Sequence, residues 1–191
     1  MKKDDIISLP NPHLRQRAKK VGLINGQIKQ LVEDMKAATL DWEDNRDHEV
    51  GVALAANQVD KLLRVVIIRH NFENKANREF EIFINPEITK YEGKIEADFE
   101  GCLSVKDIYG KVPRHTKIRL KAIDINGQEV RLKAEGFLAR VFQHEIDHTN
   151  GVVFIDHIKD KPEVFFKLQD DGKLEPLDYE KHIKNNTDLW E

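Results

Sequence analysis

The sequence predicts an α+β domain in which mostly antiparallel sheets pack around a central helix late in the chain, with a second helix near the N-terminus. Three observations support this prediction. Short segments rich in β-branched residues occupy the middle of the chain, Asn126-Gly127 separates two of them, and the apolar periodicity becomes helical after Gly136. Asn-Gly between apolar segments is the strongest short-range signal for a β-hairpin, so we expect these strands to pair antiparallel.

The helix near the N-terminus is expected to start at Gln27. Before it, Pro10-Asn11-Pro12 predicts a turn, and residues 14–20 suggest one short helical turn. From Gln27 onward, apolar residues recur at the three- and four-residue spacing of an amphipathic helix: Ile28, Leu31, Val32, Met35 and Ala38. The acidic stretch of residues 41–49 then predicts a solvated loop.

Buried strands are expected in the middle of the chain. Residues 62–68 and 80–84 are short and rich in β-branched or aromatic side chains, and Asn85-Pro86 should end the second of these strands. Residues 118–125 and 130–132 are the two strands of the predicted hairpin.

The central helix is expected between Gly136 and Asn150-Gly151. Apolar side chains recur there at helical spacing, and an Asn-Gly pair is typical of a helix C-terminus. Beyond this helix, residues 161–191 form a highly charged tail. Within the tail, residues 164–168 suggest a strand and residues 179–184 suggest a helical turn.

Composition argues against several functional classes. The 191 residues suit a single domain, and a formal net charge of -3 with a pI near 6.3 offers no basic surface for nucleic acid. Cys102 is the single cysteine, so no internal disulfide can form, which fits a reducing compartment. The chain shows no signal-peptide pattern and no segment long enough to span a membrane, and we expect a cytoplasmic protein.

A metal site is predicted from the stretch His144-Glu145-Ile146-Asp147-His148. On a helix, residues four apart lie on one face, so both imidazoles can reach one ion, and Glu145 can take a proton from water bound beside them. A catalytic site of this kind needs a third protein ligand. Cys102 offers a thiolate, and a downstream glutamate such as Glu163 or Glu175 is the alternative on spacing alone.

Three segments resemble the signature motifs of the peptide deformylase family, in that family's order. They are Gly51-Val52-Ala53-Leu54-Ala55-Ala56-Asn57-Gln58, Glu100-Gly101-Cys102-Leu103-Ser104 and Gln143-His144-Glu145-Ile146-Asp147-His148. The long stretch between Met35 and Gly51 resembles the branch of the family that is common in Gram-positive bacteria. The resemblance implies one catalytic domain over residues 1–191, with a core of about 6–158 around a central metal-binding helix and a charged extension of about 161–191.

The implied reaction is removal of the N-formyl group from the first methionine of nascent polypeptides, with release of formate. Cys102, His144 and His148 would bind one divalent ion, natively Fe2+, with Zn2+, Ni2+ or Co2+ as alternatives. Glu145 would act as the general base and acid. The implied partners are the formyl-methionyl nascent peptide and, as an open question, a transient contact with the ribosome.

Further roles follow from the same resemblance. Gln58 and the backbone N–H of Leu103 would donate hydrogen bonds to the formyl oxygen as negative charge develops on it. The substrate peptide would lie as an added strand along Val52 and Gly101, with its methionine side chain in an apolar pocket near the helix.

The resemblance also implies a structural ion pair between Glu100 and Arg114. Three positions depart from the residues usual in the family, because Ala53 and Asp60 replace glycine and Asn57 replaces the commoner proline. Ala53 adds a methyl group where the substrate backbone should approach.

Two other functions stay open at the level of sequence. A zinc endopeptidase of the His-Glu-x-x-His type would cut internal peptide bonds and would have no use for Cys102. A metal-binding protein without catalytic activity is the second alternative, against which an intact catalytic glutamate argues.

Overall fold

The computed structural model describes residues 1–190, and within them the chain forms helices, strands and short 3-10 turns. The helices are α1 (Gly26–Glu43), α2 (Gly136–Thr149), α3 (Tyr179–His182) and α4 (Thr187–Trp190). The strands are β1 (Ala53–Ala55), β2 (Val65–Arg69), β3 (Phe80–Cys102), β4 (Val105–Ile123), β5 (Glu129–Glu135), β6 (Phe165–Leu168) and β7 (Leu174–Pro176). The 3-10 turns span Lys3–Asp5, Pro12–Arg15, Ala56–Val59, Phe154–Ile158 and Pro162–Val164. None of the helices within residues 1–190 has both the length and the apolar character that crossing a membrane requires.

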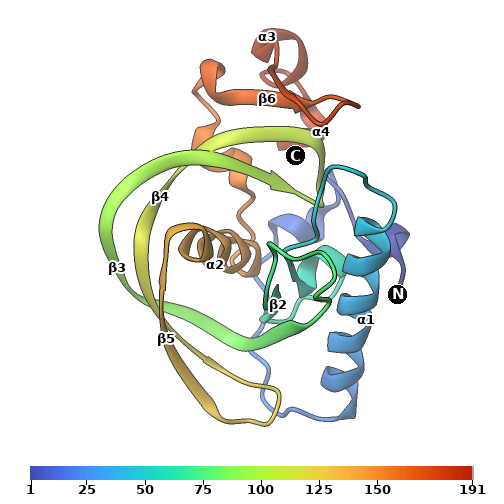
Figure 1. Ribbon diagram of the computed structural model, residues 1–191, viewed down its shortest axis with the longest axis vertical. Coiled ribbons are helices and arrows are strands. Elements are labelled where there is room, and N and C mark those ends of the chain that lie inside the picture. The colour runs from blue at the N-terminus through green and yellow to red at the C-terminus, as the bar shows by residue number, and fades with distance from the viewer. Residues whose placement is uncertain (191) are drawn as a thin grey trace.

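The strands form one seven-stranded antiparallel sheet in the order β1-β2-β3-β4-β6-β7, with β5 also paired to β4. β3 and β4 are long and strongly curved, and together with β5 they wrap around α2 (Figure 1). Helix α1 lies outside this curve, beside β1 and β2. The predicted fold class is therefore confirmed, because antiparallel strands enclose one helix and a second helix lies near the N-terminus.

Strand β3 is much longer than the sequence predicts. It passes through Asn85-Pro86, where a register shift between Ile84 and Glu87 accommodates a proline that has no N–H to donate. Asn85 adopts a φ of 53°, and its side-chain amide bonds the backbone N–H and C=O of Val21 at 2.8 and 2.9 Å. The prediction that the strand ends here is wrong, and the sequence does not signal its continuation because residues 87–94 are mostly exposed and carry no regular apolar alternation.

Helix α1 is also longer than predicted. The Asn25 side chain caps its start by accepting a hydrogen bond from the N–H of Gln27 at 3.0 Å. The helix continues to Glu43, into the stretch predicted to be a solvated loop. Glu43 is buried, forms an ion pair with the buried Arg69, and accepts a hydrogen bond from the N–H of Gly51 at 2.9 Å. The loop prediction is wrong at Glu43, because this acidic side chain is buried by its ion pair with Arg69, which lies 26 positions further along the chain.

Helix α2 fills the concave side of the curved sheet (Figure 1). Its Phe142 packs edge-on against Phe83 of β3, with 4.8 Å between the ring centroids. The helix ends at Asn150-Gly151 as predicted, with Gly151 at a φ of 78°. Glycine is needed here for a second reason, since a Cβ would lie 2.6 Å from the Arg15 carbonyl oxygen.

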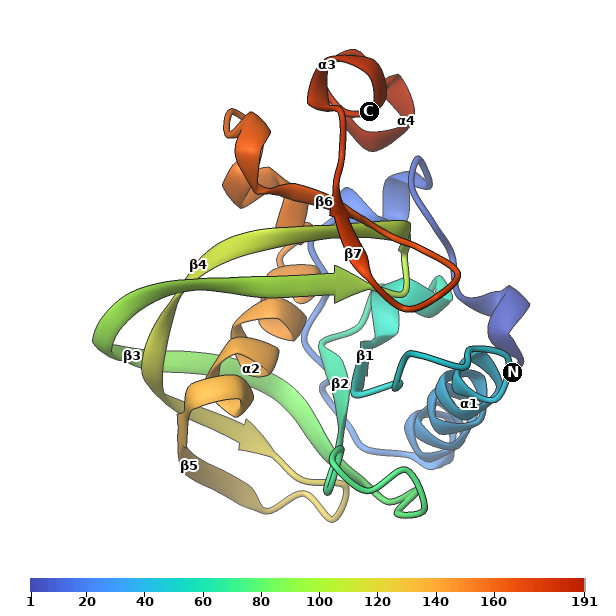
Figure 2. The ribbon, with the colours of Figure 1, turned by 45° about the horizontal axis from the view of Figure 1, so that its top comes forward.

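The charged C-terminal segment packs against the rest of the molecule (Figure 2). β6 pairs with residues 108–110 of β4 and with β7, which confirms the strand predicted near residue 165. Phe165, Ile183 and Leu189 are buried in a core that also contains Leu14 from the N-terminal region. The segment thus joins the two ends of the chain in one apolar cluster.

The buried pair of Glu43 and Arg69 gives a first prediction. Glu43→Ala should lower the free energy of unfolding by about 3–5 kcal/mol, because it leaves the Arg69 guanidinium buried without its carboxylate. Urea denaturation followed by circular dichroism measures the change. Glu33→Ala is the matched control on the same helix, since Glu33 is exposed and pairs with Lys36 at the surface, and its free energy of unfolding should stay within about 0.5 kcal/mol of the unmodified protein. Equal stabilities of the two variants would contradict the prediction.

Candidate active site

A cavity of about 290 Å³ opens between α2, the segment that precedes β1, and the end of β3. Residues from all three sequence motifs line it, among them Gln58, Cys102 and Glu145. Its remaining wall is largely aromatic and contains Trp42, Phe99, Tyr109 and Phe137. The structure thus gathers at one cavity the motif residues that lie up to about ninety positions apart in the chain.

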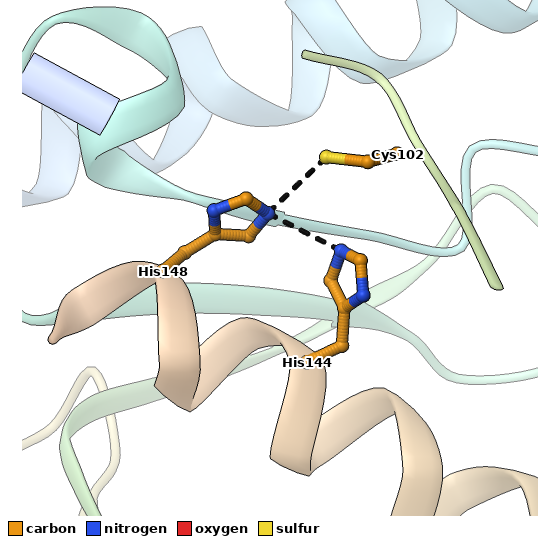
Figure 3. Close-up of side chains that lie close together, drawn as sticks. All are labelled: Cys102, His144 and His148. Atoms are coloured by element: carbon orange, nitrogen blue, oxygen red, sulfur yellow. Dashed lines mark hydrogen bonds between the residues drawn. The ribbon is translucent and has the colours of Figure 1, made fainter. Parts of the chain in front are cut away.

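Three candidate metal ligands converge at this cavity (Figure 3). Cys102 Sγ lies 3.2 Å from His148 Nε2, which in turn lies 3.2 Å from His144 Nε2. A tetrahedral zinc ion with bonds of about 2.3 Å to sulfur and about 2.0 Å to nitrogen holds its ligand atoms roughly 3.3–3.6 Å apart. The spacing of the three donor atoms therefore suits a small divalent ion.

The places of the candidate side chains in the fold favour one of them as the third metal ligand. Within residues 1–190, Cys102, His144 and His148 are the one group of three or more such side chains whose donor atoms lie within reach of one another. Glu163 lies in a 3-10 turn and Glu175 lies on β7, and both side chains are exposed. Neither glutamate belongs to the cluster, which favours the thiolate.

Glu100 fixes the orientation of His144. Arg114 donates to both of its carboxylate oxygens at 2.9 and 3.0 Å, Arg140 donates to Oε1 at 2.8 Å, and His144 Nδ1 lies 3.0 Å from Oε2. Burial alone would raise the pKa of Glu100, but the hydrogen bonds from His144 and Arg114 outweigh it and hold the pKa well below its usual range. The charged carboxylate holds Nδ1, which leaves Nε2 facing the other two donors. Sequence reasoning pairs Glu100 with Arg114 but misses Arg140, because no spacing rule connects Arg140 to β3.

Glu145 lies on the same helix and borders the cavity. Its side chain is buried, and Oε2 has no hydrogen-bond partner within the described residues. Burial raises the pKa of Glu145 to about 7, although the nearby His144 acts in the opposite direction. A carboxyl group of this kind is able to accept and return a proton near neutral pH.

Gln58 is held in one orientation by its neighbours. It lies on the 3-10 turn after β1, where its Oε1 accepts a hydrogen bond from the N–H of Ala55 at 2.9 Å. Its Nε2 lies 3.1 Å from Ser104 Oγ and 3.5 Å from Cys102 Sγ. The donor end of the amide therefore points toward the ligand cluster. Leu103, the other predicted donor, lines the cavity next to Cys102.

The two residues predicted to bind the substrate backbone both line the cavity. The carbonyl of Val52 accepts a hydrogen bond from the N–H of Arg69 at 2.7 Å, so this part of the backbone is anchored to β2. Gly101 is covered on one side by the ring of Tyr109, which would lie 2.5 Å from a Cβ at this position. Glycine is needed at residue 101 because an aromatic ring packs against its backbone.

The three departures from the family pattern are each accommodated locally. Ala53 packs in the apolar core beside α2 and also borders the cavity. The Asn57 side-chain amide donates to the backbone carbonyl of His148 at 2.5 Å, which ties the Gln58 turn to α2. Asp60 takes a left-handed φ of 62°, a conformation that aspartate tolerates better than most residues other than glycine.

The chain resembles known proteins over most of its length. The family model described as polypeptide deformylase matches residues 3–163. A relative named peptide deformylase 1 from Clostridium perfringens is 45% identical over 144 residues, which cover 75% of this chain and 90% of the relative. A peptide deformylase from Thermomicrobium roseum is 38% identical over 159 residues, which cover 82% of this chain and 86% of the relative.

Solved structures give the same result. The crystal structure of a peptide deformylase from Synechococcus elongatus in complex with actinonin has a TM-score of 0.73 and 35% identity, and the match covers 82% of this chain and 80% of that one. A peptide deformylase from Legionella pneumophila has a TM-score of 0.70 and 37% identity, with coverage of 80% and 83%.

The ligand cluster gives a second prediction. Cys102→Ala removes one of three donors, so the affinity for Zn2+ should fall by more than about 100-fold, since even groups that only orient a ligand are worth 10–100-fold. Competition with a chromogenic chelator measures the affinity, and elemental analysis measures the bound metal. His182→Ala changes an exposed histidine on α3 and should bind zinc as the unmodified protein does. Unchanged affinity in Cys102→Ala would place the third ligand elsewhere.

Proposed function

The chain belongs to the polypeptide deformylase family, and we propose that it removes the N-formyl group from the terminal formyl-methionine of nascent polypeptides, with release of formate. The observation that carries this proposal is the meeting of Cys102, His144 and His148 at a cavity that Glu145 and Gln58 also line. Two imidazoles and a thiolate that would hold a divalent ion, with a carboxyl group and an amide donor beside them, are the groups that metal-assisted hydrolysis of a linear amide uses.

We assign the metal-ligand role to Cys102, His144 and His148. A bound divalent ion would lower the pKa of a water ligand toward about 7, which makes hydroxide available at neutral pH. The imidazole of His144 is already oriented by Glu100, and the carbonyl of His148 is held by Asn57. Because Cys102, His144 and His148 supply three protein ligands, a four-coordinate ion would keep one position for water or substrate.

Glu145 is proposed to carry the proton. Glu145 lines the cavity beside the ligand cluster, and its buried Oε2 has no hydrogen-bond partner within the described residues. Its carboxyl group takes a proton from the attacking water. The same carboxyl group then returns the proton to the amine of the departing methionine, which is otherwise a poor leaving group. Burial raises the pKa of Glu145 to about 7 in the absence of an ion, and a bound cation nearby would lower it, which favours the carboxylate form that accepts the proton.

Gln58 and Leu103 are proposed to stabilise the charge that develops on the formyl oxygen. The amide of Gln58 is fixed by Ala55 and Ser104 before substrate arrives, so no reorganisation is needed when the charge forms. One such preorganised donor is typically worth about 2.7–4 kcal/mol of activation free energy. The backbone N–H of Leu103 would be the second donor.

The substrate is proposed to enter as an extended strand between Val52 and Gly101. Both residues line the cavity, and the addition of a peptide strand to a backbone edge is a recurring mode of peptide recognition. The methionine side chain would occupy the apolar part of the cavity near Val141 on α2.

Finer assignments are also proposals. We propose Fe2+ as the native ion, with Zn2+, Ni2+ or Co2+ able to replace it, because thiolate and imidazole donors accept all four. Residues 1–191 would act as one catalytic domain in the cytoplasm, with transient contact with the ribosome where its substrates emerge. The long stretch between Met35 and Gly51 supports placement in the branch that is common in Gram-positive bacteria.

The proposed reaction is tested by formate release from a formyl-methionyl tripeptide, using protein purified without oxygen and loaded with one defined metal. We expect formate to be released in a one-to-one ratio with free N-terminal methionine. An unformylated protein substrate in a parallel assay should stay intact. Cleavage of that protein without release of formate would favour a zinc endopeptidase, and loss of neither substrate in metal-loaded protein would favour a binding protein.

Glu145→Ala should keep its metal and lose turnover by roughly 10²–10⁴-fold, because the general base is removed and the ligands are not. The kinetic constant kcat measures the loss, and elemental analysis of the same sample measures the metal. Glu163→Ala provides a control, since that exposed glutamate lies outside the ligand cluster and should leave kcat unchanged. Full activity of Glu145→Ala with metal bound would disprove the assigned role.

A further inference from the structure

A hydrogen bond crosses one side of the cavity between two segments that are distant in the chain. The Tyr109 hydroxyl donates to Glu49 Oε1 at 2.6 Å, and the two residues are 60 positions apart. Glu49 lies in the segment between α1 and β1, and Tyr109 lies on β4. Both residues line the cavity. Because Glu49 shortly precedes Val52 and Tyr109 packs on Gly101, this bond joins the two backbone segments that would flank the substrate.

The Glu49 side of the bond is rigidly supported. Arg46 Nη1 donates to Glu49 Oε2 at 2.7 Å and to Asp107 Oδ1 at 3.1 Å, so both carboxylate oxygens of Glu49 are occupied. The Arg46 guanidinium also lies over the Trp42 ring, 5.0 Å from its centroid. Because each carboxylate oxygen of Glu49 already has a partner on a different segment, the side chain is held in one orientation.

The Tyr109 side of the bond reaches the backbone of Gly101. The position of a Cβ on Gly101 lies 2.5 and 2.6 Å from Cε1 and Cζ of the Tyr109 ring, so the ring covers this peptide directly. Opposite the ring, Gly110 pairs with Glu100 in the β3–β4 ladder. The hydroxyl therefore holds the ring, and the ring holds the segment that ends at Cys102.

We infer that Tyr109 and Glu49 form a strap that sets the spacing between Val52 and Gly101 and so determines how tightly the enzyme binds the substrate residues that follow methionine. This inference rests on the proposed function, because it requires the peptide to lie between those two segments. Tyr109 and Glu49 are positioning residues, since neither belongs to the ligand cluster. The strap acts on binding of the peptide backbone and leaves the hydrolytic groups in place.

Two substrates and three variants test the strap. The substrates are formyl-methionine amide, which has no following residue, and a formyl-methionyl tripeptide. The variants are Tyr109→Phe, Glu49→Ala and the double variant. Tyr179→Phe is the matched control, because the hydroxyl of Tyr179 bonds the Lys159 carbonyl in the C-terminal segment, away from the cavity.

Tyr109→Phe removes one hydrogen bond to a charged carboxylate, and only part of the lost free energy should appear in binding of the peptide. KM for the tripeptide should therefore rise about three- to tenfold. Its kcat should stay within about twofold, and KM for formyl-methionine amide should change by less than about twofold. Glu49→Ala should behave in the same way. The double variant should show no larger effect than the stronger single variant, because both substitutions remove the same interaction.

The outcomes are distinguishable. Equal KM values for Tyr109→Phe, Tyr179→Phe and the unmodified enzyme would overturn the strap while leaving the proposed function intact. Equal increases in KM for both substrates would also overturn the strap, and so would a lower kcat with reduced metal content. Either result would indicate general structural damage, which does not depend on peptide length. Inactivity of the metal-loaded unmodified protein on both substrates would overturn the proposed function and the strap together.

Discussion

The buried carboxylate of Glu100 is the interaction on which the site depends. It lies near the end of β3 and receives hydrogen bonds from Arg114 on β4 and Arg140 on α2, while it also holds His144. A buried carboxylate without partners is costly, so the two guanidiniums stabilise the charge and the charge in turn fixes the imidazole. One side chain thereby connects both long strands and the central helix.

The curvature of the sheet brings the third ligand to the other two. Helix α2 presents His144 and His148 at a spacing that any helix gives, but Cys102 comes from the far end of a long strand. β3 bends around α2 before the chain turns into β4 (Figure 1). Its last residue, Cys102, lines the cavity. The metal site is therefore a product of the whole sheet, and shifts in β3 or β4 would act on it.

Features that depend on neighbouring residues were predicted well from the sequence, and features that depend on long-range contacts were not. The fold class and the limits of α2 followed from periodicity and from Asn150-Gly151, because these depend on neighbouring residues. The assignment of Cys102 needed resemblance to a family, since spacing alone also allowed two glutamates. The length of β3, the burial of Glu43 and the contacts of Tyr109 were not predictable, because each is decided by a partner tens of positions away.

The C-terminal segment has a consequence for how this protein is made. Arg15 donates to the Leu189 carbonyl at 2.5 Å, and Leu189 and Ile183 complete the apolar cluster that also contains Leu14. During synthesis this cluster stays open until residue 189 has left the ribosome, although the three motifs have emerged well before. Because Leu14 packs with Ile183 and Leu189, this part of the core is complete only when both distant segments are present, which makes it one of the last apolar clusters that can close.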